Sequence, residues 1–184
     1  MAKPFDATLN SLIDARPDDW VAFLCAKLGI PVGPAEAIDT DLSATVQADK
    51  VFRLLSPRAY LHLELEANHR LGIPADLMRY NVLIGHGHTD PVHSVLLLLR
   101  PGANATDMTG SYSRLGLDGQ PYHTFTYKVV RLWLEPFSRL LAAGPGLAPL
   151  AMLTDDAAND MTAAFTQFTK RLRQPDVNDK LREE

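Results

Sequence analysis

The sequence predicts an α/β fold in which a mixed β-sheet is flanked by helices. Three observations support it. Residues 48–66 form a hairpin pattern with apolar alternation, residues from about 74 have helical spacing, and Val92–Leu99 is an almost unbroken apolar run. Such a run is typical of a strand that is buried on both faces, and therefore central in its sheet.

Composition limits the function classes. The chain has 184 residues, 46% apolar and 22% charged, which suits one soluble domain with a sizeable core. Its net charge of -4 argues against binding nucleic acid by bulk electrostatics, but it does not exclude a nuclease whose acidic site holds cations. The single cysteine, Cys25, excludes an internal disulfide and a cysteine-based zinc cluster.

The N-terminus has no apolar signal core, and the apolar run Val95–Leu99 is far too short to cross a bilayer. We therefore expect a cytoplasmic protein with no membrane partner. Two short helices follow: Phe5–Ala15 on an apolar stripe, and a second that Pro17 begins and Gly29 closes. Asp6 lies in the first turn of the first helix, where a carboxylate suits the helix dipole.

Aspartates mark the next two predicted strands. A short strand over Ala37–Leu42 would place Asp39 and Asp41 on one face. The better strand is Ala48–Leu55, with Asp49 at its beginning, and Ser56–Arg58 is a tight turn. The chain then returns through the central stretch, Tyr60–Arg70.

In the central stretch, Leu61, Leu63 and Leu65 share one face of a strand, and the opposite face carries Tyr60, His62, Glu64 and Glu66. One interpretation of that opposite face is a half-exposed strand with a wet acidic surface. The other is a functional site, because glutamate is depleted in strands and local rules are often broken where function requires it. Antiparallel pairing would bring the start of the first strand, at Asp49, toward Glu64 and Glu66.

The rest of the chain adds a helix from Pro74, whose inward positions are predicted to be Leu77, Tyr80, Asn81 and Ile84. The run Gly85-His86-Gly87-His88 ends this helix, and its two histidines are interpreted as solvated residues of the helix end rather than metal ligands. Further elements are expected as follows: strands at Thr109–Leu115 and Tyr122–Trp133 around an Asp118-Gly119 turn, helices at Glu135–Ala142 and Asp155–Arg173, and a charged tail at Gln174–Glu184.

The chemistry that Asp49 and Glu64 offer is an all-oxygen site, which suits Mg²⁺ or Mn²⁺. Such an ion can hold a phosphodiester and lower the pKa of an attacking water. Asp6, on a neighbouring helix, could complete the shell through water. With Glu66 beside them, three carboxylates cluster, and their repulsion predicts a raised pKa for at least one.

Four segments carry a resemblance: F-D-A-T-L (Phe5–Leu9), A-D-K-V-F-R-L (Ala48–Leu54), L-H-L-E-L-E-A-N-H-R (Leu61–Arg70) and R-Y-N (Arg79–Asn81). In this order they resemble the recombination-promoting nuclease (Rpn) family, which includes transposase-associated proteins, within the PD-(D/E)XK phosphodiesterase superfamily. The resemblance implies a restriction-endonuclease-like core over residues 1–150, with residues 151–184 as a C-terminal helix and charged tail packed on or extending from it. It also implies a metal-dependent DNA endonuclease, with DNA as partner and a homodimer as one form of assembly.

The resemblance assigns Asp6 as the helix acid, Asp49 as the metal-binding aspartate and Glu64 as the second metal ligand. Glu66 takes the catalytic position where the superfamily usually has lysine and the family often has glutamine. A lysine there supplies positive charge to the developing phosphorane, which Glu66 cannot do.

Arg70 or Arg79 could supply that charge from the following helix and approach substrate phosphates. The alternative is a catalytically degenerate relative that keeps the fold and acts in nucleic-acid or protein binding. A further alternative is an unrelated small-molecule enzyme that uses Asp39 and Asp41.

Overall fold

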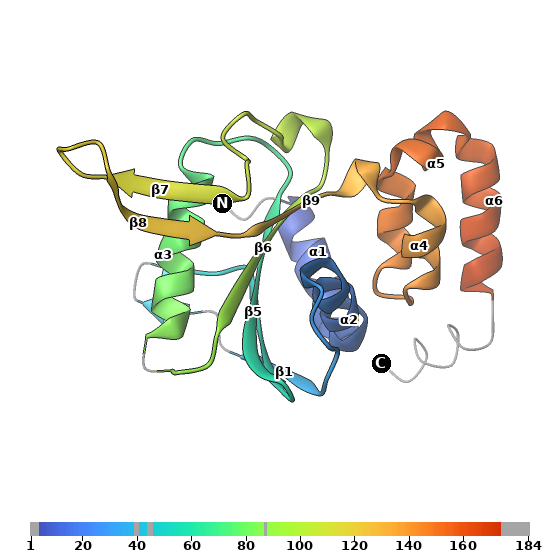
Figure 1. Ribbon diagram of the computed structural model, residues 1–184. Coiled ribbons are helices and arrows are strands. Elements are labelled where there is room, and N and C mark those ends of the chain that lie inside the picture. The colour runs from blue at the N-terminus through green and yellow to red at the C-terminus, as the bar shows by residue number, and fades with distance from the viewer. Residues whose placement is uncertain (1–3, 39–40, 44–45, 87, 174–184) are drawn as a thin grey trace.

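The computed structural model is a mixed five-stranded sheet with helices on both faces (Figure 1), which confirms the predicted α/β class. It describes residues 4–38, 41–43, 46–86 and 88–173, with side chains for residues 8–38, 48–86 and 88–173. The strands of the sheet, in spatial order, are β1 (Ala35–Ile38), β4 (Lys50–Leu55), β5 (Arg58–Glu66), β6 (Val92–Leu98) and β9 (Lys128–Arg131).

The sheet combines an antiparallel half with a parallel half. β1 pairs antiparallel with β4 and β4 with β5, whereas β5–β6 and β6–β9 are parallel. The parallel pairing requires a crossover, which the helix α3 (Ile73–Gly85) supplies between β5 and β6. β6 is an internal strand that is buried on both faces, as its apolar run predicts, although β5 is the middle strand of the order. Val95 and Leu97 join one core cluster, and Leu96 and Leu98 join the other.

Two helices, α1 (Pro4–Ala15) and α2 (Pro17–Leu28), cover one face of the sheet, and α3 covers the opposite face (Figure 1). Helix α2 begins with a proline and ends at Gly29, which has the left-handed φ of 69° that favours glycine at this position. The leucines of β5 pack under α1 and α2, so the alternate residues of β5 are directed at α3.

The predicted strand Tyr122–Trp133 is two strands, because the chain changes sheets at Tyr127. β8 (Pro121–Thr126) pairs with β7 (Ser111–Leu115) in a separate two-stranded hairpin, and only β9 joins the main sheet. Figure 1 shows that hairpin projecting beyond α3. A further small pair is made by β2 (Asp41–Ser43) and β3 (Val46–Gln47).

The predicted helix Asp155–Arg173 is also divided, into α5 (Asp155–Asn159) and α6 (Met161–Leu172). Asp160 has a non-helical backbone, and its Oδ1 accepts the N–H of Ala163 at 2.9 Å, which caps the second helix. The remaining elements are α4 (Phe137–Ala142) and the 3₁₀ turns at Pro101–Ala103, Leu132–Leu134 and Ala148–Leu153. Leu150, Ala157 and Ala164 share the core cluster of the sheet and α2. None of the described helices is long and apolar enough to cross a membrane.

Candidate active site

The carboxylates of Asp49 and Glu64 meet where the β4–β5 hairpin opens. Lys50 pairs with Leu63 in the register of the two strands, so Asp49, one residue before β4, lies beside Glu64. The backbone N–H of Asp49 donates to Oε1 of Glu64 at 3.1 Å, and the backbone N–H of Leu65 donates to Oδ2 of Asp49 at 2.8 Å. Each acid is thus held by the backbone next to the other, as the hairpin predicts.

The acidic face of β5 is buried, so the interpretation as a wet surface is wrong. His62 has no exposed area, Glu64 is 7% exposed and Glu66 is 4% exposed, while Asp49 is half-buried. Glutamates are almost never buried to this degree without partners. Ionising these glutamates therefore carries a desolvation cost, which arises because α3 covers this face of the sheet.

Burial sets the charge states of the site. It raises the pKa of the Glu64 carboxyl from 4.5 to about 7, against the opposing effect of hydrogen bonds with Asp49; the charge of Glu66 raises the pKa as well, and that of Arg70 lowers it. Burial also lowers the pKa of His62 from 6.5 to about 4, although the charge of Asp49 acts in the opposite direction. The predicted raised carboxylate pKa is confirmed, with burial a larger cause than repulsion.

A chain of polar groups lies behind Glu64. Nε2 of His62 is 3.0 Å from Oε1 of Glu64, and Nδ1 of His62 is 3.0 Å from Oγ of Ser94 on β6. The side-chain amide of Asn81 on α3 donates to the same Oγ at 3.0 Å. The ring of Tyr80 meets that of His62 edge-on, with centroids 5.8 Å apart.

Sequence reasoning placed His62 on the acidic face without assigning it a role, and it missed Ser94 altogether. The helical spacing of α3 did direct Tyr80 and Asn81 inward, and both are half-buried against the site. Nothing in the local pattern of β6 marks Ser94, since the residue is one polar position in an apolar strand.

The two arginines predicted to approach substrate phosphates, Arg70 and Arg79, lie at different distances from the carboxylates. Nε of Arg70 donates to Oε1 of Glu66 at 2.9 Å, and Nη1 of Arg70 contacts Asp76 in the first turn of α3. Arg79 pairs with Asp76, at 3.5 Å, and its guanidinium lies over the ring of Tyr80, with which its side chain also interacts. The structure therefore brings Arg70 to the site and leaves Arg79 at its rim.

Asp6 belongs to α1, but its side chain lies outside the described residues. The same holds for the competing pair, since Asp39 and the side chain of Asp41 fall outside them.

The donor set fits a hard divalent cation. Asp49 and Glu64 offer carboxylate oxygens, which Mg²⁺ and Mn²⁺ prefer, and a cation would offset the cost of ionising the buried Glu64. Among the described side chains, no group of three His, Cys, Asp or Glu residues could hold a metal ion. Water would therefore supply the remaining ligands, as is usual for Mg²⁺.

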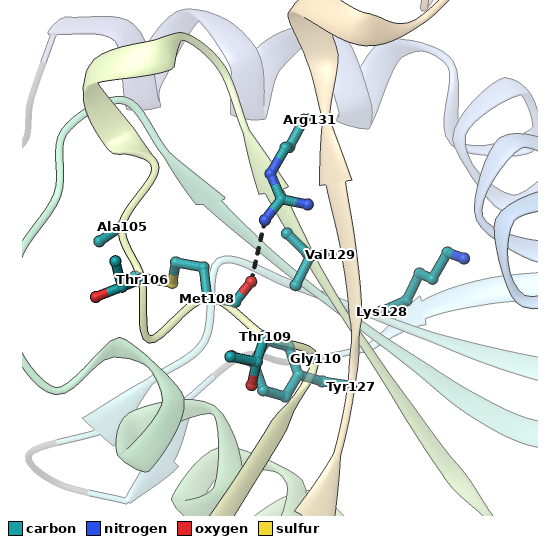
Figure 2. Close-up of a pocket in the computed structure, with 9 residues that line it drawn as sticks. All are labelled: Ala105, Thr106, Met108, Thr109, Gly110, Tyr127, Lys128, Val129 and Arg131. Atoms are coloured by element: carbon teal, nitrogen blue, oxygen red, sulfur yellow. Dashed lines mark hydrogen bonds between the residues drawn. The ribbon is translucent and has the colours of Figure 1, made fainter.

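A separate cavity of about 630 Å³ lies at the outer edge of β9, where it is also lined by Ala105, Thr106, Met108, Thr109 and Gly110. Figure 2 shows Arg131 at this cavity, where its Nη2 donates to the carbonyl oxygen of Met108 at 3.1 Å. The described residues that line it include no carboxylate and no histidine. The cavity is therefore not the carboxylate site, which we define as Asp49, His62, Glu64, Glu66 and Arg70.

Comparison with protein-family models, with curated proteins and with solved structures found no significant match to this chain. Its function is therefore inferred from the geometry and chemistry of the carboxylate site.

Proposed function

We propose that the chain is a metal-dependent DNA endonuclease in which Asp49 and Glu64 are the protein ligands of Mg²⁺ or Mn²⁺. One observation carries the proposal: backbone N–H groups hold the two acids side by side at the hairpin opening, although one of them is buried. An arrangement that only stabilised the fold would gain from an apolar residue at 64, because burying a carboxylate is costly. A bound divalent cation would offset the desolvation cost of the ionised carboxylate by its electrostatic attraction to it.

The order of elements supports a restriction-endonuclease-like core. A helix that carries Asp6, a hairpin that carries Asp49 and Glu64, a following helix and a buried parallel strand occur in the sequence order that the resemblance implies. When bound, a divalent cation polarises the phosphodiester and lowers the pKa of an attacking water.

Arg70 takes the part of the missing lysine in this proposal. Its guanidinium is anchored by Glu66 and Asp76, yet 41% of its side chain is exposed, so it can also face a substrate phosphate. Its charge reaches Glu64, where it lowers the carboxyl pKa. Glu66 thus orients the positively charged guanidinium of Arg70, while a lysine at position 66 would itself carry the charge. Arg79 can bind phosphate farther out, at the rim of the site.

A second candidate is a catalytically degenerate relative that binds DNA or protein. The observation that favours it is the ion pair between Arg70 and two carboxylates, Glu66 and Asp76, which reduces the positive charge available to a phosphate. The net charge of -4 points in the same direction.

Plasmid nicking in Mg²⁺ or Mn²⁺, beside calorimetric titration with Mn²⁺, separates the two candidates. The wild type is expected to nick DNA and bind Mn²⁺, and Asp49→Asn and Glu64→Gln are expected to lose both. Glu36→Gln, at an exposed glutamate of β1 that pairs with Arg53, is the matched control and is expected to keep both. Mn²⁺ binding without nicking by the folded wild type supports the degenerate relative. A folded wild type that neither nicks nor binds Mn²⁺ refutes the metal site.

A further inference from the structure

The hydrogen-bonded chain behind Glu64 links three elements of the fold. It runs from Asn81 on α3 through Ser94 on β6 to His62 and Glu64 on β5. His62 and Ser94 are fully or almost fully buried, with exposed fractions of 0% and 2%. His62 therefore cannot touch a substrate, and any part it has in the proposed reaction acts through Glu64.

The partners of the ring define its tautomer. The Asn81 amide nitrogen can only donate, so it donates to Oγ of Ser94. The Ser94 hydroxyl then has its own proton to give, and Nδ1 of His62 lies 3.0 Å away as an acceptor. The ring proton is left on Nε2, which faces the Glu64 carboxylate at 3.0 Å. Every donor in the chain then meets an acceptor, which the opposite tautomer does not achieve.

The chain also distinguishes the two oxygens of Glu64. The Nε2–H of His62 and the backbone N–H of Asp49 both donate to Oε1. Neither of these described donors is bonded to Oε2. The Glu64 carboxylate is thereby held through Oε1 by two donors, the ring of His62 and the backbone of Asp49.

We infer that His62 is a positioning residue: Ser94 and Asn81 hold it in the Nε2–H tautomer, and it fixes Glu64 through Oε1 for ligation of the divalent cation. This inference rests on the proposed metal site. Hydrogen-bond partners of metal ligands orient those ligands, and their removal commonly weakens metal affinity by about 10- to 100-fold.

The first test needs no metal. Nitrogen-15 NMR of the metal-free protein reports the tautomer of each histidine, and the signal of His62 is identified by its loss in His62→Gln. The expected result is a protonated Nε2 and an unprotonated Nδ1. In Ser94→Ala the Nδ1 acceptor loses its donor, so a mixture of tautomers is expected. A wild-type ring protonated on Nδ1 overturns the inference.

The second test is Mn²⁺ affinity by calorimetry. His62→Leu removes the donor and is expected to weaken binding by at least about tenfold. His62→Gln, whose amide nitrogen can occupy the place of Nε2, is expected to bind close to the wild type, and this rescue is not expected from a residue that only fills space. His123→Leu, at an exposed histidine of β8, is the control.

The outcomes separate the two proposals. Unchanged Mn²⁺ affinity in folded His62→Leu refutes the positioning role. If that variant does not fold, Ser94→Ala decides instead: several-fold weaker binding supports the role, and wild-type affinity with an unchanged tautomer refutes it. If the wild type binds no Mn²⁺, the proposed function fails and positioning for a cation fails with it. The NMR result still shows whether the ring of His62 carries its proton on Nε2, the nitrogen that faces Glu64.

Discussion

The buried His62–Glu64 pair should make opposite contributions to the pH dependence of stability. The pKa of Glu64 is raised from 4.5 to about 7, so its stabilising contribution is complete below pH 4.5 and is lost as the pH rises through 7. The pKa of His62 is lowered from 6.5 to about 4, so its contribution is complete above pH 6.5 and is lost as the pH falls through 4.

The magnitudes follow from the same values. One pKa unit corresponds to about 1.36 kcal/mol, so each residue changes the free energy of unfolding by about 3 kcal/mol across its range. Between pH 4.5 and 6.5 the two changes have opposite signs and nearly cancel in the wild type. Glu64→Gln removes the fall in the free energy of unfolding with rising pH that is due to Glu64. The rise due to His62 remains, because burial is the largest cause of the lowered pKa of His62.

Urea unfolding at a series of pH values tests this directly. The free energy of unfolding of Glu64→Gln, relative to that of the wild type, should rise by about 3 kcal/mol between pH 4.5 and 7. The free energy of unfolding of Glu36→Gln, a change at an exposed glutamate, should depend on pH as that of the wild type does. If that of Glu64→Gln also depends on pH as that of the wild type does, Glu64 is not a buried carboxyl with a raised pKa, and the account of the site fails.

Three further predictions concern metal binding, the Glu66 ion pair and the hairpin. Mn²⁺ affinity by calorimetry should rise with pH up to about 7, by up to about tenfold per pH unit, because Glu64 must lose its proton to bind; a flat profile would argue against Glu64 as a ligand. Glu66→Lys should destabilise the fold by about 3 kcal/mol or more in thermal unfolding, since it places an ammonium beside Arg70 at a side chain that is 5% exposed. An unchanged melting temperature would contradict that ion pair. Gly33→Ala should cost about 1–3 kcal/mol, because a Cβ there would lie 1.6 Å from a carbonyl oxygen of the β4–β5 turn; a neutral effect would show that the turn can move.

The sequence by itself determined the features that depend on local spacing. Period-two alternation in β5 separated Leu61 and Leu63 from His62 and Glu64, and the short turn before it made the hairpin antiparallel. These two facts were sufficient to bring Asp49 to Glu64. The apolar run of β6 identified an internal strand of the sheet, since a strand covered on both faces has few polar residues.

Only the tertiary structure decided what surrounds those residues. Burial of Glu64 and Glu66 depends on α3 covering their face, and the contact between His62 and Ser94 depends on the parallel register of β5 and β6. The break of the long strand at Tyr127 likewise depends on which partner each half pairs with. These features join residues that are far apart in the chain, and their energies come from packing and desolvation. Local sequence patterns carry the alternation and the turns, but they do not carry the charge states and hydrogen bonds that such packing creates.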